Sequence, residues 1–316
     1  MSYEKILVTG ANGFIGTALC DFLRQHGADV IAAVRQNAQK NECEVGSFSA
    51  SMDWTHVLKG CKTIVHLAAR AHVLDDEARD PLAEFRAINV DATLNLVRQA
   101  ARIGIERFIF ISSIGVNGAE TFLKPFSELS TPQPYSNYAL SKFEAEEGLK
   151  DICLHTGMEF VIIRPPLVYG HQAPGNFRSL LKLTSKGLPL PLKLVKNQRS
   201  IICLENLVSF IDLCIISKKA KNQIFLIADG TDVSTPMLIE LLSEGMDKKA
   251  ILFPVSMSIL SLGARLIGRR HLYTQLCGSL QIDIAKAQDL LGWIPPVNIS
   301  DGIRRAGQGY LYEKTV

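Results

Sequence analysis

The segment "VTGANGFIG", Val8 to Gly16, decides the fold of this chain. The apolar run "KILV" leads into it, and "FIGTALCDFLRQHG" follows it with apolar residues at helical spacing. Its glycines allow a tight turn between strand and helix and let the backbone approach a pyrophosphate. The helix N-terminus then offers unpaired N–H groups and a partial positive charge. The segment therefore predicts a strand, turn and helix that bind a dinucleotide.

Further apolar runs alternate with helical patterns through the first half of the chain. The runs are "DVIAAV", "TIVHLAA", "RFIFISS" and "EFVIIRP", and the helical patterns cover about 81–103 and 137–155. The runs are continuous rather than alternating, which is typical of strands buried on both faces of a parallel sheet. We therefore predict an α/β fold, a doubly wound parallel sheet of the Rossmann type with a smaller α+β C-terminal substrate lobe.

The alternation of apolar runs and helical patterns ends after Pro165, where Pro and Gly become frequent in "RPPLVYGHQAPGN" and "KGLPLPLK". Shorter mixed elements follow. We predict a dinucleotide-binding domain over residues 1–170 and a lobe that is mostly substrate-binding over 171–316. The apolar run "QIFLIA", near 222–228, is expected to return to the sheet of the first domain.

Composition excludes several classes of protein. The chain has 316 residues, 47% of them hydrophobic, and a net charge of +3 without a long basic run, so neither disorder nor a nucleic-acid partner is expected. Its seven cysteines form no CxxC pair and no metal-ligand spacing, which predicts free thiols in the cytoplasm and no metal site. No signal peptide and no apolar run of the ~18 residues that span a membrane is expected. The stretch "PVSMSILSLGARLIG" predicts an amphipathic helix and leaves a role at a membrane surface open.

The motif "YALSK" places Tyr138 and Lys142 on one face of a helix. A lysine ammonium beside a phenol favours the phenolate, so we expect the pKa of Tyr138 to move toward neutrality. Such a tyrosine exchanges a proton with a sugar hydroxyl or carbonyl. Ser113, at the end of the strand "RFIFISS", can hydrogen-bond the same oxygen. The pair Tyr310 and Lys314 has the same spacing and is interpreted as a solvated helix end.

Together these elements resemble the extended short-chain dehydrogenase/reductase family of sugar-nucleotide epimerases, dehydratases and reductases. The motifs are "TGANGFIG", "HLAA", "SSIGVNG", "YALSK", "RPPLVYG" and "NQRSIICLENLV", and they cover nearly the whole chain. The resemblance implies that Ser113, Tyr138 and Lys142 are the catalytic triad. It also implies a cofactor, NADP or NAD, held by Gly10, Asn12, Gly13, Phe14, Ile15, Gly16, Arg35, Asp53, Trp54, Leu67, Ala68, Ala69, Asn89 and Pro165.

On the substrate side the resemblance implies a UDP-sugar in the C-terminal lobe. Asn176 and Arg199 would hold its phosphates, and Leu190 lies in the segment "GLPLPL" that would frame the base. The dehydratases carry an Asp-Glu pair after the serine, where this chain has Ile114 and Gly115, so dehydration is not expected. The family often forms homodimers through two helices per subunit. The helices that begin near positions 81 and 137 are the candidates here.

Two reactions share this catalytic triad, a 4-ketoreduction and a 4-epimerisation. An acidic residue after the second strand binds the ribose hydroxyls of NAD, whereas this chain has Arg35 there, which suits the 2'-phosphate of NADP. Segments such as "GSLQID" and "LLGWIPP" also resemble the subgroup that reduces UDP-4-keto-6-deoxy-N-acetylglucosamine for surface polysaccharide. We therefore expect an NADPH-dependent 4-ketoreductase. The alternatives are a UDP-glucose or UDP-N-acetylglucosamine 4-epimerase with bound NAD, and a non-catalytic dinucleotide sensor, against which the complete triad argues.

Overall fold

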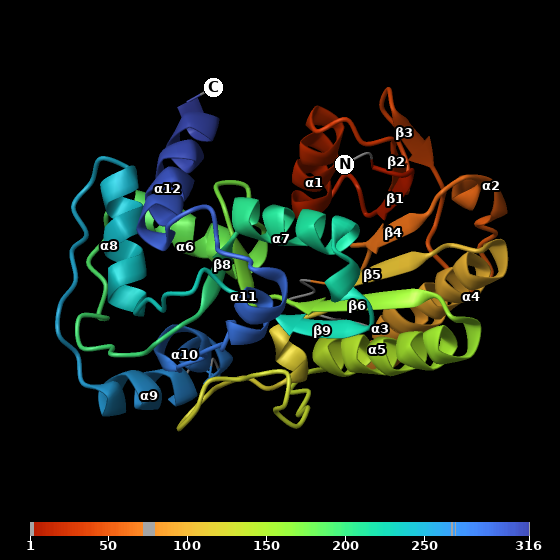
Figure 1. The fold of residues 1–316 in the computed structure, drawn as a ribbon. Coiled ribbons are helices and arrows are strands. Elements are labelled where there is room, and N and C mark those ends of the chain that lie inside the picture. Colours follow the sequence, from red (N-terminus) through yellow and green to blue (C-terminus); the bar gives the residue numbers. More distant parts are fainter. Residues whose placement is uncertain (1–2, 72–79, 267, 269, 316) are drawn as a thin grey trace.

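A seven-stranded parallel sheet forms the centre of the larger lobe (Figure 1). The computed structural model describes residues 3–71, 80–266, 268 and 270–315. In spatial order the strands are β3 (Glu42–Glu44), β2 (Val30–Val34), β1 (Ile6–Thr9), β4 (Thr63–His66), β5 (Arg107–Ile111), β6 (Glu159–Arg164) and β9 (Gln223–Leu226). Every pair of neighbours is parallel. This confirms the doubly wound Rossmann arrangement, with β9 at the edge beside β6.

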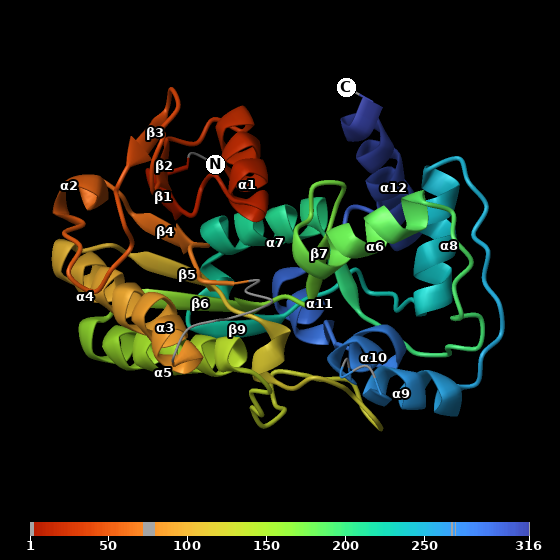
Figure 2. The same cartoon turned by 180° about the vertical axis from the view of Figure 1, so that it is seen from behind.

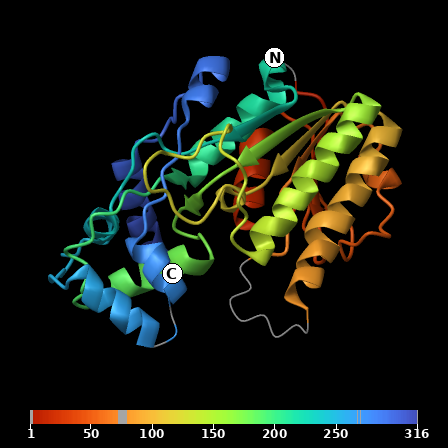
Figure 3. The ribbon, with the colours of Figure 1, turned by 90° about the horizontal axis from the view of Figure 1, so that it is seen from below.

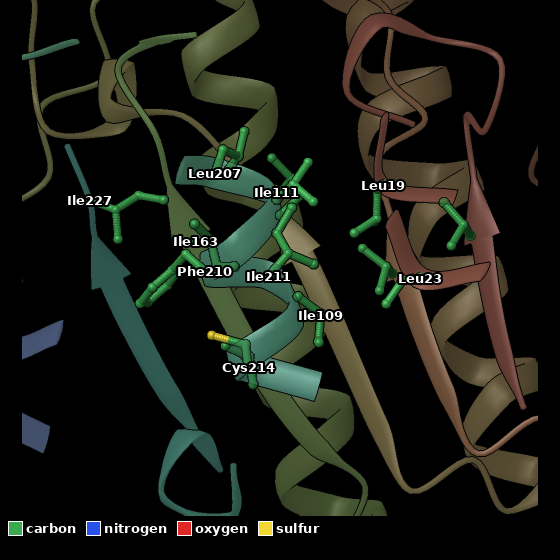
Figure 4. Close-up of a cluster of buried hydrophobic side chains, with 14 of the residues drawn as sticks. Leu19, Leu23, Ile109, Ile111, Ile163, Leu207, Phe210, Ile211, Cys214 and Ile227 are labelled. Carbon is green, nitrogen blue, oxygen red and sulfur yellow. The ribbon is translucent and has the colours of Figure 1, made fainter. Parts of the chain in front are cut away.

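Helices cover both faces of the sheet because alternate strand residues point to opposite sides. On one face Ile109 and Ile111 pack against α1 (Phe14–Gln25) and α7 (Leu204–Ile216), as Figure 4 shows. On the other face Phe108 and Phe110 pack against α4 (Thr93–Ile103) and α5 (Asn137–Thr156). The short helices α2 (Thr55–Leu58) and α3 (Pro81–Arg86) adjoin α4.

The second lobe lies beside the carboxyl end of the sheet (Figure 2). Its core joins the two-stranded parallel sheet of β7 (Leu167–Tyr169) and β8 (Ile201–Cys203) to helices from the last third of the chain. The remaining elements are η3 (Lys218–Ala220), α6 (Gly175–Ser185), α8 (Thr235–Gly245), α9 (Met257–Leu266), α10 (Arg270–Cys277), α11 (Ala285–Leu291) and α12 (Ile299–Thr315).

Three local features differ from the sequence expectation. Strand β3 was not predicted because "ECE" contains no apolar run. The helical pattern over 81–103 is interrupted by the π-helical segment η1 (Ala87–Ala92), which breaks the regular helical period. The run "RFIFISS" is a strand only to Ile111, and its last serine begins the 3-10 turn η2 (Ile114–Val116).

Candidate active site

The glycine-rich turn has the shape that a dinucleotide pyrophosphate requires. Gly10 has a φ of +66°, and a Cβ added there would lie 2.9 Å from the backbone nitrogen of Ala68. A Cβ at Gly16 would lie 2.1 Å from the carbonyl oxygen of Gly10, so the helix can pack this closely only with glycine. Helix α1 begins after Gly13, and no side chain of the described residues caps its N-terminus. Its first N–H groups therefore suit a phosphate, with Asn12 exposed at the turn and Phe14 and Ile15 partly buried.

The segment that follows β4 lies against this turn. The backbone nitrogens of Leu67 and Ala68 donate to the carbonyl and hydroxyl oxygens of Thr9, both at 3.3 Å. The ring of His66 also contacts the Thr9 hydroxyl, at 2.7 Å, and is fully buried as a structural residue. Leu67 and Ala68 therefore border the glycine-rich turn at the carboxyl edge of the sheet, and Ala69 follows them. Their contact with the cofactor stays a prediction.

Asn89 connects this segment to the helix of the "YALSK" motif. It lies in the π-helical segment η1 and is 1% exposed. Its side-chain oxygen accepts from the backbone nitrogen of Arg70 at 2.8 Å, and its amide donates to the carbonyl of Arg70 and to the hydroxyl of Ser141. The side chain thus holds the segment after β4 against α5. A π-helical turn is frequent at functional sites, and here it turns Asn89 inward.

A second set of contacts brings together Ser113, Pro165 and the start of α5. The backbone N–H of Ile114 donates to the carbonyl of Pro165 at 3.0 Å, which ties η2 to the end of β6. The Ser113 hydroxyl accepts from the backbone N–H of Gly115 at 3.1 Å. A Cβ at Gly115 would lie 3.3 Å from the Cβ of Ala139, so the serine turn packs on the first turn of α5, which also carries Tyr138.

Burial controls the protonation of the "YALSK" pair. It raises the pKa of Tyr138 to about 12, with a smaller contribution from the neighbouring Tyr135. It also lowers the pKa of Lys142 to about 7, against the opposing charge of Glu146. The Lys142 ammonium lies 3.9 Å from the centre of the Phe110 ring. The expected shift of Tyr138 toward neutrality is therefore wrong for the cofactor-free protein, because desolvation outweighs the attraction of a lysine that faces an aromatic ring.

A buried polar network next to Lys142 was missed in the sequence. Glu146 follows Lys142 by one helical turn, and its carboxylate accepts from the guanidinium of Arg164, with Nε to Oε1 at 3.0 Å. Arg164 also donates to the side-chain oxygen of Asn117 at 3.0 Å, and all three side chains are buried. The signal was available, since Tyr138, Lys142 and Glu146 follow one another at intervals of four on one helix face.

The substrate-side arginine lies close to the catalytic turn. The Arg199 guanidinium donates to the carbonyl of Gly278 at 3.1 Å and is partly buried. Burial lowers the pKa of Arg199, whereas the charges of Tyr135 and Glu120 oppose that change. Tyr135 in turn lies against Gly115, where an added Cβ would come within 3.1 Å of its ring. Tyr135 therefore packs on the serine turn and acts electrostatically on Arg199.

The other predicted substrate residues lie farther out in the second lobe. Asn176 is exposed in the first turn of α6. Leu190 is partly buried and pairs with Leu252 through backbone hydrogen bonds. The ring of Phe14 lies 3.2 Å from the position of an added Cβ at Gly170, so the helix after the glycine-rich turn contacts the second lobe directly.

The residues predicted at the adenosine end of the cofactor site differ in their exposure to solvent. Arg35 is exposed directly after β2, at the edge where the backbone N–H of Ala11 donates to the carbonyl of Ala33 at 3.3 Å. Asp53 is exposed, and its hydrogen bonds from Thr55 lower its carboxyl pKa. Trp54 is fully buried against Phe48 in the core. Its indole therefore packs in the core of the sheet, and a contact of Trp54 with the cofactor stays a prediction.

The described residues contain no group of three or more His, Cys, Asp or Glu side chains that could hold a metal ion. Among the helices of the described segments, none is both long and apolar enough to cross a membrane.

Comparison with known proteins identifies the family. Residues 6–228 match the NAD dependent epimerase/dehydratase family. The chain belongs to this family. A "UDP-glucose 4-epimerase" of Vibrio cholerae is 41% identical over 314 residues, which cover 98% of this chain and 96% of that protein. An "N-acetyl-alpha-D-glucosaminyl-diphospho-ditrans,octacis-undecaprenol 4-epimerase" of Escherichia coli O157:H7 is 25% identical and covers 96% of this chain and 95% of that protein.

A solved structure shares the fold. The crystal structure of UDP-glucose 4-epimerase from Thermotoga maritima, with UDP-glucose, superposes with a TM-score of 0.77 at 22% identity and covers 99% of this chain and 100% of that chain. Membership in the epimerase/dehydratase family identifies the chain as an enzyme with a nicotinamide cofactor, and the glycine-rich turn and uncapped helix fit that cofactor.

Proposed function

We propose that this enzyme is a nucleotide-sugar 4-epimerase that retains NAD and acts on a UDP-sugar. The observation that carries the proposal is the 41% identity with the Vibrio cholerae epimerase over 98% of this chain. This similarity supports the epimerase over the 4-ketoreductase that we expected from the sequence. The Escherichia coli relative also carries a 4-epimerase name, and both names describe a sugar that is attached to a diphosphate.

In the proposed reaction Tyr138 transfers the proton at the O4 oxygen of the sugar. Its raised pKa keeps the phenol protonated in the free enzyme, and approach of a charged Lys142 would ease its ionisation. The Ser113 hydroxyl, on the turn that packs against α5, would hold the same oxygen. Bound NAD would supply the hydride acceptor and donor at C4.

Arg199 and Asn176 would hold the diphosphate, with Leu190 in the wall of the base site. A guanidinium suits this task because it donates in a fork that matches phosphate oxygens. Burial of Arg199 near Tyr135 strengthens such a contact. The proposal thus assigns the cofactor to residues 1–170 together with β9, and the nucleotide sugar mostly to residues 171–316.

The proposed enzyme is a homodimer. The helices α4 and α5 lie side by side and offer a regular face, on which Leu154 is 82% exposed and Ile103 is 41% exposed. Two such pairs would form a four-helix bundle around a two-fold axis. Sedimentation equilibrium tests this, and a monomer at all concentrations would reject it.

Arg35 favours a second candidate, the NADPH-dependent 4-ketoreductase. Its exposed guanidinium at the carboxyl end of β2 suits a 2'-phosphate, and the carboxylate that would repel this phosphate is missing after β2. The reductase consumes one NADPH for each 4-keto sugar, whereas the epimerase regenerates its cofactor.

The deciding experiment incubates the purified enzyme with UDP-glucose, UDP-galactose or their N-acetylhexosamine counterparts and a trace of NAD. Formation of the 4-epimer without net NADH supports the epimerase. Oxidation of NADPH that requires a UDP-4-keto-6-deoxy-hexosamine, without epimer formation, supports the reductase instead. Dinucleotide binding without turnover of either substrate would reject both and favour a sensor.

A further inference from the structure

An apolar row on α9 faces solvent. Ile259, Leu262 and Leu266 recur at helical spacing, and their exposures are 64%, 58% and 78%. The helix packs on the lobe through the opposite row, to which Met257 and Leu260 belong. Both sides of α9 are therefore apolar. The lobe covers one side only in part, since no residue of the helix is fully buried, and the other side is open to solvent. Exposed rows of this kind mark interaction sites.

The loop between η2 and α5 carries a second exposed apolar group. Phe122 is 88% exposed and Leu123 is 97% exposed, and Lys124 follows them. The backbone nitrogen of Thr121 donates to the carbonyl of Ser279, two residues after α10, which itself packs on α9. Figures 1 and 2 place the loop and α9 along the same lower side of the molecule, and Figure 3 looks at that side.

The segment that carries α9 and α10 is basic, and Asp283, which follows it directly, accepts from the backbone N–H of Ala285 at the start of α11. The 35 residues from Lys248 to Ile282 contain five Lys or Arg and no Asp or Glu. Arg265, beside the apolar row, is exposed. The acidic residues of the neighbouring loop face inward, because Glu128 accepts from the backbone nitrogen of Leu226 and Glu120 lies against Gly278. Apolar residues next to basic ones are the pattern of helices that lie in the interface of an anionic membrane.

We propose that the row on α9 and the loop tip at Phe122 and Leu123 dock the enzyme onto an anionic lipid surface. Charge complementarity favours this occupant over a second copy of the chain, because a two-fold contact through this side would place like charges opposite one another. The ten residues of α9 lie in the interface rather than cross it. The proposal goes beyond the proposed epimerase activity and does not depend on it.

Vesicle sedimentation tests the proposal. The probes are vesicles of phosphatidylcholine alone and vesicles that also contain phosphatidylglycerol. The native enzyme should sediment with the second kind only, and less so at high salt. The variant Ile259→Ser/Leu262→Ser/Leu266→Ser should bind the anionic vesicles about tenfold more weakly, because it keeps the charges and loses the apolar contact.

The matched control is Ile294→Ser, an equally exposed apolar residue between α11 and α12, which should sediment like the native enzyme. Thermal unfolding and turnover in solution should be unchanged in the triple variant. Absence of sedimentation at low salt, or equal sedimentation of the triple variant, would overturn the proposal. A change of oligomeric state in the triple variant would overturn it in favour of a second copy. Turnover is measured separately, so failure of docking is distinct from failure of the epimerase proposal.

Discussion

Glu146 and Arg164 form an ion pair in which the two side chains are 0% and 3% exposed, one helical turn from Lys142. Breaking a buried pair leaves an uncompensated charge and costs about 3–5 kcal/mol. We expect Glu146→Gln to lose stability of this order in urea unfolding. It should also lower the pKa of Lys142 further, because the charge of Glu146 raises that pKa.

The adjacent Glu147 provides the control for this pair. It is about half exposed and pairs with Lys150 on the surface. The variant Glu147→Gln should lose less than about 1 kcal/mol, as exposed pairs do. Equal losses in both variants would show that Arg164 does not depend on its partner.

Removal of the phenol should stop the chemistry without removing the cofactor. Tyr138→Phe should lower kcat by about 10²–10⁴-fold, the usual contribution of a general acid or base. The dissociation constant for NAD, measured by calorimetry, should stay within a factor of about 2. Tyr312→Phe, on an exposed tyrosine of α12, should match the native enzyme. A native kcat in Tyr138→Phe would contradict the mechanism.

Arg35→Asp tests the nucleotide preference. A charge-assisted contact with a 2'-phosphate contributes about 1.5–3 kcal/mol, so the affinity for NADP should fall about 10- to 150-fold. The affinity for NAD should not fall, because an aspartate can accept from both ribose hydroxyls. Competition binding with both cofactors measures the ratio. If the ratio is unchanged, Arg35 does not contact the cofactor.

The stability of the cofactor-free protein should rise with pH above about 7 because of Lys142. Its pKa is about 7 in the folded protein against an ordinary value of 10.5. Between these values the unfolded chain binds the proton and the folded chain does not, so the free energy of unfolding increases with pH. Urea unfolding at several pH values checks this. The slope in this window should decrease in Lys142→Met, and an unchanged slope would contradict the burial argument.

Loss of the Asn89 hydrogen bonds, which hold the segment after β4 against α5, should weaken cofactor binding. Asn89→Ala leaves the backbone of Arg70 without this partner, at a cost of about 1–3 kcal/mol. We expect a higher dissociation constant for NAD in calorimetry, because the Leu67–Ala69 segment is no longer held to α5. Asn206→Ala removes the equivalent pair of hydrogen bonds, with the backbone N–H and carbonyl of Val297, and is the control. Similar NAD affinities in the two variants would reject a positioning role for Asn89.

The local features of the fold and site were predictable from the sequence. The glycine-rich turn requires a positive φ at Gly10 and a close backbone approach at Gly16, and only glycine permits both. The buried parallel strands follow from continuous apolar runs, and the spacing of Tyr138 and Lys142 follows from the helical period. These features depend on residues close together in the chain.

The tertiary structure decided what depends on distant neighbours. Burial moves the pKa of Tyr138 up and that of Lys142 down, and the sequence could not show how much solvent each group loses. Tyr310 was expected at a solvated helix end, but it is 3% exposed and packs in the core of the second lobe. Arg164 pairs with Glu146 only because β6 lies against α5. The apolar row of α9 is significant only because the opposite row already packs on the lobe. Spacing along the chain fixes which residues share a face, whereas desolvation and pairing are set by what the fold brings against that face.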